Sequence, residues 1–549
     1  MVYCGKPSRG CQACKTRRIK CDEGKPACFQ CTKSKKSCPG YKDDFDLVFR
    51  NETNAVARKV ERKTIKDAQR RRLQQRSTGA ANQVSNVVCS TPRAIITVIT
   101  QPVEEQAICY FLDNFVISSR RIPFQLYLEH LIPMHNKAKP DSPVHAAIAS
   151  VSMAALSKRQ HNQPLMYRAH SKYAKALSMV NAALADPEEA KSDETLFSVL
   201  LMSMVEMISA SQTPGWTAHI EGAAALLNLR GEDQFSNNIS ASLFYAARSQ
   251  LIISCIVNCL PLEQHLNISL AAIKSDSHLS KLAVLSLPIP TLRAKSRALF
   301  ERTKKRHRSK DAVLALMHSA QVTHTGLIGW ESNLDSIWRY RTIARVENIP
   351  EDLEAADAYQ GNIDWYQDTW VATMWNTYRT NRIVVLSILV KCRRWLAQNG
   401  NAVSQYDNLD PPSDTPNLNT QDFSKSGDNE SELGAMDIDD DVSTIAATPN
   451  IPTLMNMTRA LVSAICASVP FHCGYIFPQG KRNTILETRS GRPKAIGGYV
   501  LMWPLFVARN AWGIPDAQRS WLRGRLLFIG RESGFDQAKD MANMTGDFL

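Results

Sequence analysis

The sequence has no long uninterrupted hydrophobic run. Its longest apolar stretch, Leu196 to Ile208, contains Glu206 and is much shorter than the roughly 20 residues that a membrane-spanning helix needs. The first residues turn basic at once and lack the apolar core of a secretory signal. We therefore expect an intracellular chain with no membrane partner, in which the fourteen cysteines are reduced thiols or metal ligands rather than disulfides.

Short catalytic signatures are missing as well. The sequence contains no HExxH, no GxSxG, no phosphate-binding glycine loop and no cluster of metal ligands beyond the first 40 residues, so we predict that the protein is not an enzyme. Helical active sites can lack such signatures, which leaves an enzyme with an appended metal cluster as an alternative, beside a thiol- or metal-responsive sensor. Against the sensor, Cys255 and Cys259 lie in the apolar stretch LIISCIVNCL, which is typical of small buried side chains.

Acidic residues are scarce at one end of the chain. Residues 1–76 hold 21 Lys and Arg against 8 Asp and Glu, whereas the rest holds 45 against 44. A basic head on a nearly neutral body indicates a polyanionic partner. Double-stranded DNA is favoured over a membrane surface, because no apolar Leu, Trp or Phe face accompanies the charge.

The basic head contains six regularly spaced cysteines. The pattern C-x2-C-x6-C occurs twice in a row, at Cys11, Cys14, Cys21, Cys28, Cys31 and Cys38. Two cysteines at i and i+3 lie on one side of a helical turn and can bind one ion, as structural zinc requires. Two tetrahedral zinc ions need eight ligand positions, which six thiolates supply if the first cysteine of each repeat bridges. The alternative is a four-cysteine zinc ribbon, which leaves the third cysteine of each repeat without a role.

These residues resemble the fungal zinc binuclear cluster transcription regulators. The resemblance extends from Gly10 to Cys38 and includes the signature K-x-R-R-x-K-C at positions 15–21 and Pro26 in the joining loop. It implies a nuclear, sequence-specific regulator of RNA polymerase II transcription with two zinc ions per chain. In this family the first helix enters the major groove, typically over CGG-like half-sites. By analogy, the targets are metabolic or secondary-metabolite genes.

The same resemblance suggests which side chains contact DNA. Arg17 and Arg18 are expected to read base edges, because arginine bonds guanine O6 and N7 with two parallel hydrogen bonds. The expected phosphate contacts are Lys15, Lys20, Lys33, Lys35 and Lys36. For each lysine, a solvated surface charge is an equal alternative.

The head is expected to comprise a cluster domain at 1–50, with its core at 11–38, and a basic helix or linker at 51–102. The linker region holds ten basic and three acidic residues between Arg50 and Arg76. Its apolar residues do not sustain a heptad repeat, so a homodimer is not supported by this segment. A basic arm along phosphates or a nuclear import signal fits better.

The remainder, 103–549, is predicted to be an all-α regulatory domain. One expected helix starts after the turn Thr213-Pro214-Gly215, ends at Gly231 and buries one stripe: Trp216, Ile220, Ala223 and Leu227. Together with His219, Gly222, Leu226 and Arg230, this helix is similar to the helical middle region of one branch of the fungal regulators, as is the stretch GGYVLMWPLFVARNAW at 497–512.

An acidic insertion interrupts the predicted helical domain at 404–450. It contains eleven acidic residues, one lysine and many Asn, Ser and Pro, a composition that cannot bury enough apolar area to order itself. We expect it to be disordered. Either it is an inert loop, or its scattered apolar residues make it an activation segment that contacts the transcription machinery.

Overall fold

The computed structural model describes two separate parts of the chain. These are residues 10–39 without 18, 25 and 36, and residues 101–544 with gaps at 118–126, 140, 210–213, 236, 268–276, 303–308, 400–447, 477–486 and 489–493. The chain divides into two compact units, Met1–Val98 and Ile99–Leu549. The predicted basic linker therefore lies outside the described residues, apart from 101 and 102.

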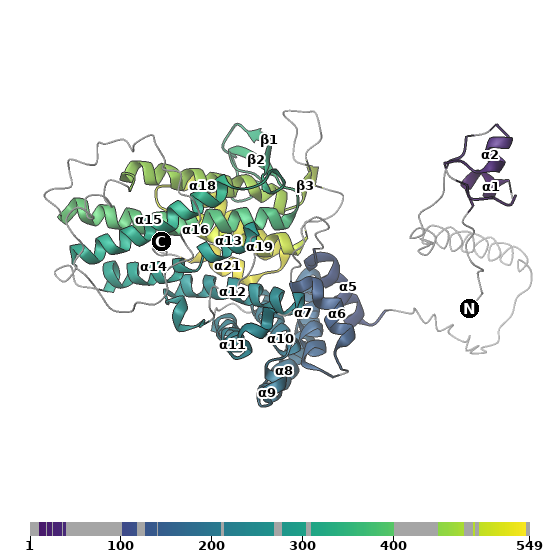
Figure 1. Cartoon of the computed structure of the whole chain (residues 1–549), viewed down its shortest axis with the longest axis horizontal. Helices are drawn as coiled ribbons and strands as arrows, with labels where there is room; N and C mark the ends of the chain where they lie inside the picture. The colour runs from purple at the N-terminus through teal and green to yellow at the C-terminus, as the bar shows by residue number, and fades with distance from the viewer. Residues whose placement is uncertain are drawn as a thin grey trace, which may run out of the picture. The chain divides into compact units, whose positions relative to one another are not determined.

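The second unit is a body of packed helices (Figure 1). Its first helices are α5 (Val103–Phe115), α6 (Leu131–Lys137), α7 (Pro143–Gln160), α8 (Gln163–Leu184), α9 (Pro187–Ala190), α10 (Asp193–Ser209) and α11 (Pro214–Arg230). They continue with α12 (Asn238–Asn258), α13 (His278–Leu285), α14 (Pro288–Arg297), α15 (Lys310–Ser332) and α16 (Thr369–Asn399). The last helices are α18 (Ile451–His472), α19 (Ala495–Arg509), α20 (Asp516–Phe528) and α21 (Asp536–Asn543). Figure 1 shows α5 to α10 at one end of this body and α15, α16 and α18 at the other.

Several helices begin where the sequence supplies a capping side chain. Ser142 accepts a hydrogen bond from the His145 amide at the start of α7, and Asn237 caps α12 in the same way. At α11 the predicted stripe is confirmed, because Trp216 is 8% exposed and the other three residues are fully buried. The helix ends at Gly231, whose φ of 59° suits the left-handed conformation that glycine adopts readily.

Among the described helices, two resemble membrane spans by length and composition alone. They are α12 and α18, but 67% and 56% of their most apolar windows are buried inside the helical body. Burial of this kind is expected for the core helices of a large packed domain. Both helices contribute to one continuous hydrophobic core that also includes α7, α10, α16 and α19.

The fold-class prediction is confirmed, because the body is mostly helical; its described residues also form two small antiparallel sheets. Strand β1 (Arg341–Val346) pairs with β2 (Gly361–Trp365), and β3 (Tyr475–Ile476) pairs with β4 (Glu487–Thr488). Strand β1 is mostly exposed and β2 has only five residues, so neither shows a regular apolar alternation. Tertiary contacts rather than strand pattern hold β2, which packs against α18.

The predicted acidic insertion at 404–450 lies almost wholly outside the described residues. Its last three residues are described, and they belong to the helical body. Thr448 is buried and its carbonyl accepts a hydrogen bond from Arg393, while Asn450 caps α18 through the Thr453 amide at 2.9 Å. The described helical body therefore resumes at Thr448, within the last three residues of the predicted insertion.

Candidate metal centre and nucleic-acid interface

Each cysteine repeat builds one short helical turn. Cys11 precedes α1 (Gln12–Thr16), and its sulfur accepts a hydrogen bond from the Cys14 amide at 3.4 Å. Cys28 precedes α2 (Phe29–Lys33), and its sulfur accepts from the Cys31 amide at 3.3 Å. The first cysteine of each repeat thus caps its own helix, and the cap turns the second cysteine toward the same interior.

The six sulfurs form two overlapping groups. One consists of Cys11, Cys14, Cys21 and Cys28, the other of Cys11, Cys28, Cys31 and Cys38, and within each group all Sγ atoms lie within 4.8 Å of one another. Among the described residues no other group of this kind occurs. Both groups contain the first cysteine of each repeat, so two sulfurs lie in position to bridge.

The spacing fits zinc and excludes disulfides. Sγ atoms lie 3.7 Å apart between Cys11 and Cys28, between Cys11 and Cys31, and between Cys14 and Cys28. A Zn–S bond of about 2.3 Å separates the sulfurs of a tetrahedral site by about 3.8 Å, whereas disulfide sulfurs are about 2.0 Å apart. Burial raises the pKa of the Cys28 thiol, so thiolates this crowded require a compensating cation.

The third cysteine of each repeat also belongs to this arrangement. The Cys21 sulfur accepts a hydrogen bond from the Cys11 amide at 3.5 Å, which links the end of the basic stretch to the start of α1. A four-cysteine ribbon gives Cys21 and Cys38 no function, yet each completes one of the two groups. The two groups of four sulfurs share the Cys11 and Cys28 sulfurs.

Arg17 has contacts that the sequence did not indicate. Its guanidinium donates to the Ser34 hydroxyl at 3.0 Å, and its Nη2 lies 3.9 Å from the Cys14 sulfur and 3.7 Å from the Cys31 sulfur. Six thiolates with two Zn²⁺ would carry a net charge of about −2, which a neighbouring guanidinium would offset in part. In this conformation Arg17 ties α1 to α2 and is turned toward the cluster; base reading by Arg17 stays a prediction.

The other basic residues predicted to contact DNA differ in their exposure, and two of them are not described by the structure. Lys20, Lys33 and Lys35 are exposed, and Lys15 is half-buried on α1. Arg18 and Lys36 lie outside the described residues, as does Cys4. The exposed lysines therefore have free access to a phosphate backbone, while the one described arginine of the signature is partly occupied by the cluster.

The loop that joins the two repeats is held by a carboxylate that sequence reasoning missed. Asp22 accepts a hydrogen bond from the Phe29 amide at 3.0 Å, and this bond lowers the pKa of Asp22. The only sequence signal is an acidic residue directly after Cys21. Asp22 thereby connects the end of the first repeat to the beginning of α2.

Cysteines and histidines of the described helical body show no comparable site. Cys255 and Cys259 are buried side chains at the end of α12, as predicted, and Cys109 is exposed. His219, expected as a core or cap residue, is half-buried and its Nε2 lies 2.7 Å from the Tyr173 hydroxyl. That hydrogen bond gives His219 a structural partner.

Comparisons with known proteins support both units. Residues 9–46 match the fungal Zn(2)-Cys(6) binuclear cluster domain, and residues 108–283 match the fungal specific transcription factor domain. The transcription factor dbaG of Emericella nidulans is 23% identical over 448 residues, which are 79% of this chain and 90% of that protein. No solved structure matches.

Other relatives match the cluster alone. White-opaque regulator 2 of Candida albicans is 68% identical over 34 residues, 6% of this chain and 8% of that protein. Sterol uptake control protein 2 of Saccharomyces cerevisiae is 61% identical over 33 residues, 6% of this chain and 4% of that protein. The matched families are transcription factors rather than enzymes, and the cluster domain implies that the chain binds zinc and DNA. The chain thus contains a fungal zinc binuclear cluster domain and a fungal specific transcription factor domain, and it is similar over most of its length to a fungal transcription factor.

Proposed function

We propose that this protein is a nuclear regulator of RNA polymerase II transcription that reads CGG-like half-sites in the major groove. The observation that carries the proposal is the arrangement of exposed lysines around a compact core of six sulfurs. A segment of about 30 residues is too short to fold on a hydrophobic core, so metal binding supplies the rigidity that base recognition needs. The target is proposed to be a metabolic or secondary-metabolite gene set; the metabolic part is supported by the similarity of the cluster to that of sterol uptake control protein 2.

The proposed centre contains two zinc ions. Cys14 and Cys21 would hold one ion, Cys31 and Cys38 the other, and the remaining two cysteines would bridge. Zinc in such a centre is structural, because every ligand position is taken by sulfur and none is left for water or substrate. Arg17 would support the centre by hydrogen bonds to two sulfurs.

The basic residues divide into two roles. Arg18 follows α1 and is proposed to read base edges, with Arg17 as a second reader if DNA draws it away from the cluster. The proposed phosphate contacts are Lys15, Lys20, Lys33, Lys35 and Lys36. Phosphate contacts add affinity on every sequence, whereas base contacts separate one sequence from another.

The test compares Arg18→Ala with Lys20→Ala on a CGG half-site duplex and on a scrambled duplex over a range of salt. Arg18→Ala should cost about 1–3 kcal/mol on the specific duplex and little on the scrambled one. Lys20→Ala should weaken both and lower the salt slope by about one unit. Lys137→Ala, an exposed residue of α6, is the matched control. Zinc content is measured for each variant. Equal losses on both duplexes for Arg18→Ala would show that Arg18 only positions the protein.

A further inference from the structure

A large cavity lies inside the helical body, away from the cysteine cluster. Its volume is about 1120 Å³, and helices α12, α13, α16, α19 and α21 contribute to its wall. Aromatic side chains form part of that wall, among them Tyr127, Trp216, Phe235, Tyr245, Trp370 and Trp503. Protein interiors are normally close-packed, and small-molecule sites range from about 300 to 1,000 Å³. The cavity is therefore slightly larger than the usual range of ligand sites and too large to be a packing defect.

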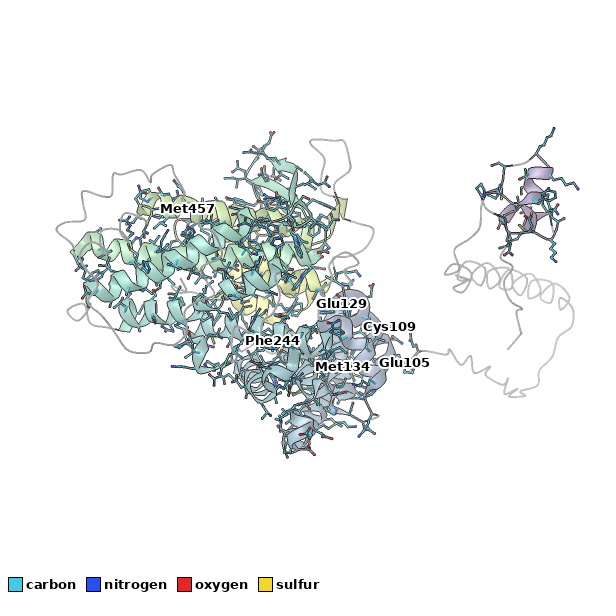
Figure 2. All side chains as sticks on the ribbon, viewed as in Figure 1. Glu105, Cys109, Glu129, Met134, Phe244 and Met457 are labelled. Atoms are coloured by element: carbon cyan, nitrogen blue, oxygen red, sulfur yellow. The ribbon has the colours of Figure 1, made fainter. Side chains whose placement is uncertain are left out.

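One charged side chain of the cavity wall is buried without a polar partner. Arg248, on α12, is 3% exposed, and its Nε and Nη1 are enclosed with no hydrogen-bond partner. Its guanidinium carbon lies 5.6 Å from the ring centre of Phe244 and 5.1 Å from that of Tyr245. Phe244, one turn earlier on the same helix, lies in the interior of the body (Figure 2). No hydrogen bond or ion pair joins Arg248 to another described residue.

The other buried arginines of the described residues differ from Arg248 in this respect. Arg379 donates to the Tyr366 hydroxyl at 2.7 Å, and Arg525 pairs with Asp357 at 3.1 Å. The remaining three, Arg230, Arg293 and Arg393, also have an acidic or carbonyl partner. Buried charges in proteins are as a rule paired, because removal from water is costly.

Arg248 keeps its charge in this environment. Burial lowers the pKa of Arg248 to about 10, which still leaves the guanidinium protonated at neutral pH. Its two aromatic neighbours stabilise a cation only in part. The cavity thus presents an unpaired cation beside a wall of aromatic rings, and the missing partner is an anion.

We propose that this cavity binds an aromatic carboxylic acid, with the carboxylate paired to Arg248 and the ring system packed against the aromatic wall. A carboxylate matches the guanidinium because two parallel hydrogen bonds form between them. The cavity also carries Glu232 and Asp233, both exposed at its edge. These two carboxylates repel a second negative charge, so a monocarboxylate is favoured over a dicarboxylate.

The site would make the helical unit a receptor for a small organic acid, independent of how the cysteine cluster recognises DNA. A ligand that binds only the folded body raises its stability as the ligand concentration exceeds the dissociation constant. It also removes the cost of the unpaired charge, so the acid should bind more tightly than a neutral molecule of the same shape. This difference is what the experiment measures.

The experiment uses the full zinc-loaded chain and two fluorescent probes, pyrene-1-carboxylate and the neutral 1-pyrenemethanol. The acid should bind saturably at one site per chain and raise the melting temperature, and the alcohol should bind at least about tenfold more weakly. Arg248→Gln should reduce the affinity for the acid by about tenfold or more and leave the alcohol unchanged. Arg394→Gln, whose guanidinium lies 4.3 Å from the ring centre of Trp512, is the matched control and should bind both probes normally.

Two further variants keep the test decisive if Arg248→Gln does not fold. Arg248→Lys retains the charge but loses the paired geometry, so its affinity for the acid should fall between those of the wild type and a neutral substitution. Ala246→Phe places a ring into the cavity and should abolish binding of both probes with an unchanged circular dichroism spectrum. The proposal is overturned if the acid does not bind at millimolar concentration, if both probes bind equally, or if the Arg248 variants retain wild-type affinity for the acid. Binding to DNA is measured separately, so a failure here leaves the DNA-binding proposal intact.

Discussion

Replacement of Cys28 by serine should damage the metal centre about twice as much as replacement of Cys21. The Cys28 sulfur belongs to both sulfur groups, whereas the Cys21 sulfur belongs to one. Structural zinc contributes about 10–16 kcal/mol of apparent free energy in small domains, or about 2.5–4 kcal/mol for each of four ligands. On that basis Cys28→Ser should cost about 5–8 kcal/mol and Cys21→Ser about 2.5–4 kcal/mol, as upper values because serine retains an oxygen.

The assay is a chelator titration of the full chain, with zinc counted by elemental analysis at each step. The wild type should retain two zinc ions per chain at the start. Cys28→Ser should release both at low chelator concentration, and Cys21→Ser should release one before the other. Cys109→Ser, an exposed cysteine of α5, is the control and should behave as the wild type. One zinc per wild-type chain, or identical titrations for the two cluster variants, would refute the shared-sulfur geometry.

Two further predictions concern the helical body. Gly497→Ala should destabilise it by about 1–3 kcal/mol in a denaturant titration, because the added Cβ would lie 2.0 Å from the His472 carbonyl oxygen. Gly222→Ala is the control and should be neutral or stabilising, because its added Cβ would have no neighbouring atom within 4 Å. Equal effects of the two substitutions would contradict the packing argument. His472 is buried and accepts a hydrogen bond from Asn376, and burial lowers its pKa to about 3, so its folded form is neutral. Below the unfolded pKa of about 6.5 the unfolded chain gains a proton that the folded chain does not, so the free energy of unfolding should fall by about 1.4 kcal/mol per pH unit from this group. His472→Gln should remove this contribution to the pH dependence of the free energy of unfolding between about pH 6 and about pH 4. An unchanged pH dependence would show that His472 is not kept neutral by folding.

The metal centre was predictable to a large extent because its information is local. Cysteine spacing within 28 residues decides which sulfurs can meet, and α1 and α2 are too short to rearrange that order. The orientation of Arg17 was not predictable. The sequence around Arg17 does not indicate whether its side chain is directed toward DNA or toward the sulfurs. Its orientation depends on the hydrogen bond to Ser34, which the second repeat brings close.

The sequence by itself determined the helical class of the body and the start of several helices, through helical periodicity and capping residues. Periodicity marks the face that α11 buries, and Ser142 or Asn237 marks a beginning. Only the tertiary structure decided the pairing of β1 with β2, because this pair depends on packing against α18. The tertiary structure also decided which partner each buried charge has. The sequence gives no sign that Arg248 and Arg379 differ. In the structure Arg379 donates a hydrogen bond to a tyrosine hydroxyl, whereas Arg248 lines a cavity without a polar partner. The difference arises because partners from distant helices come together only when the body folds.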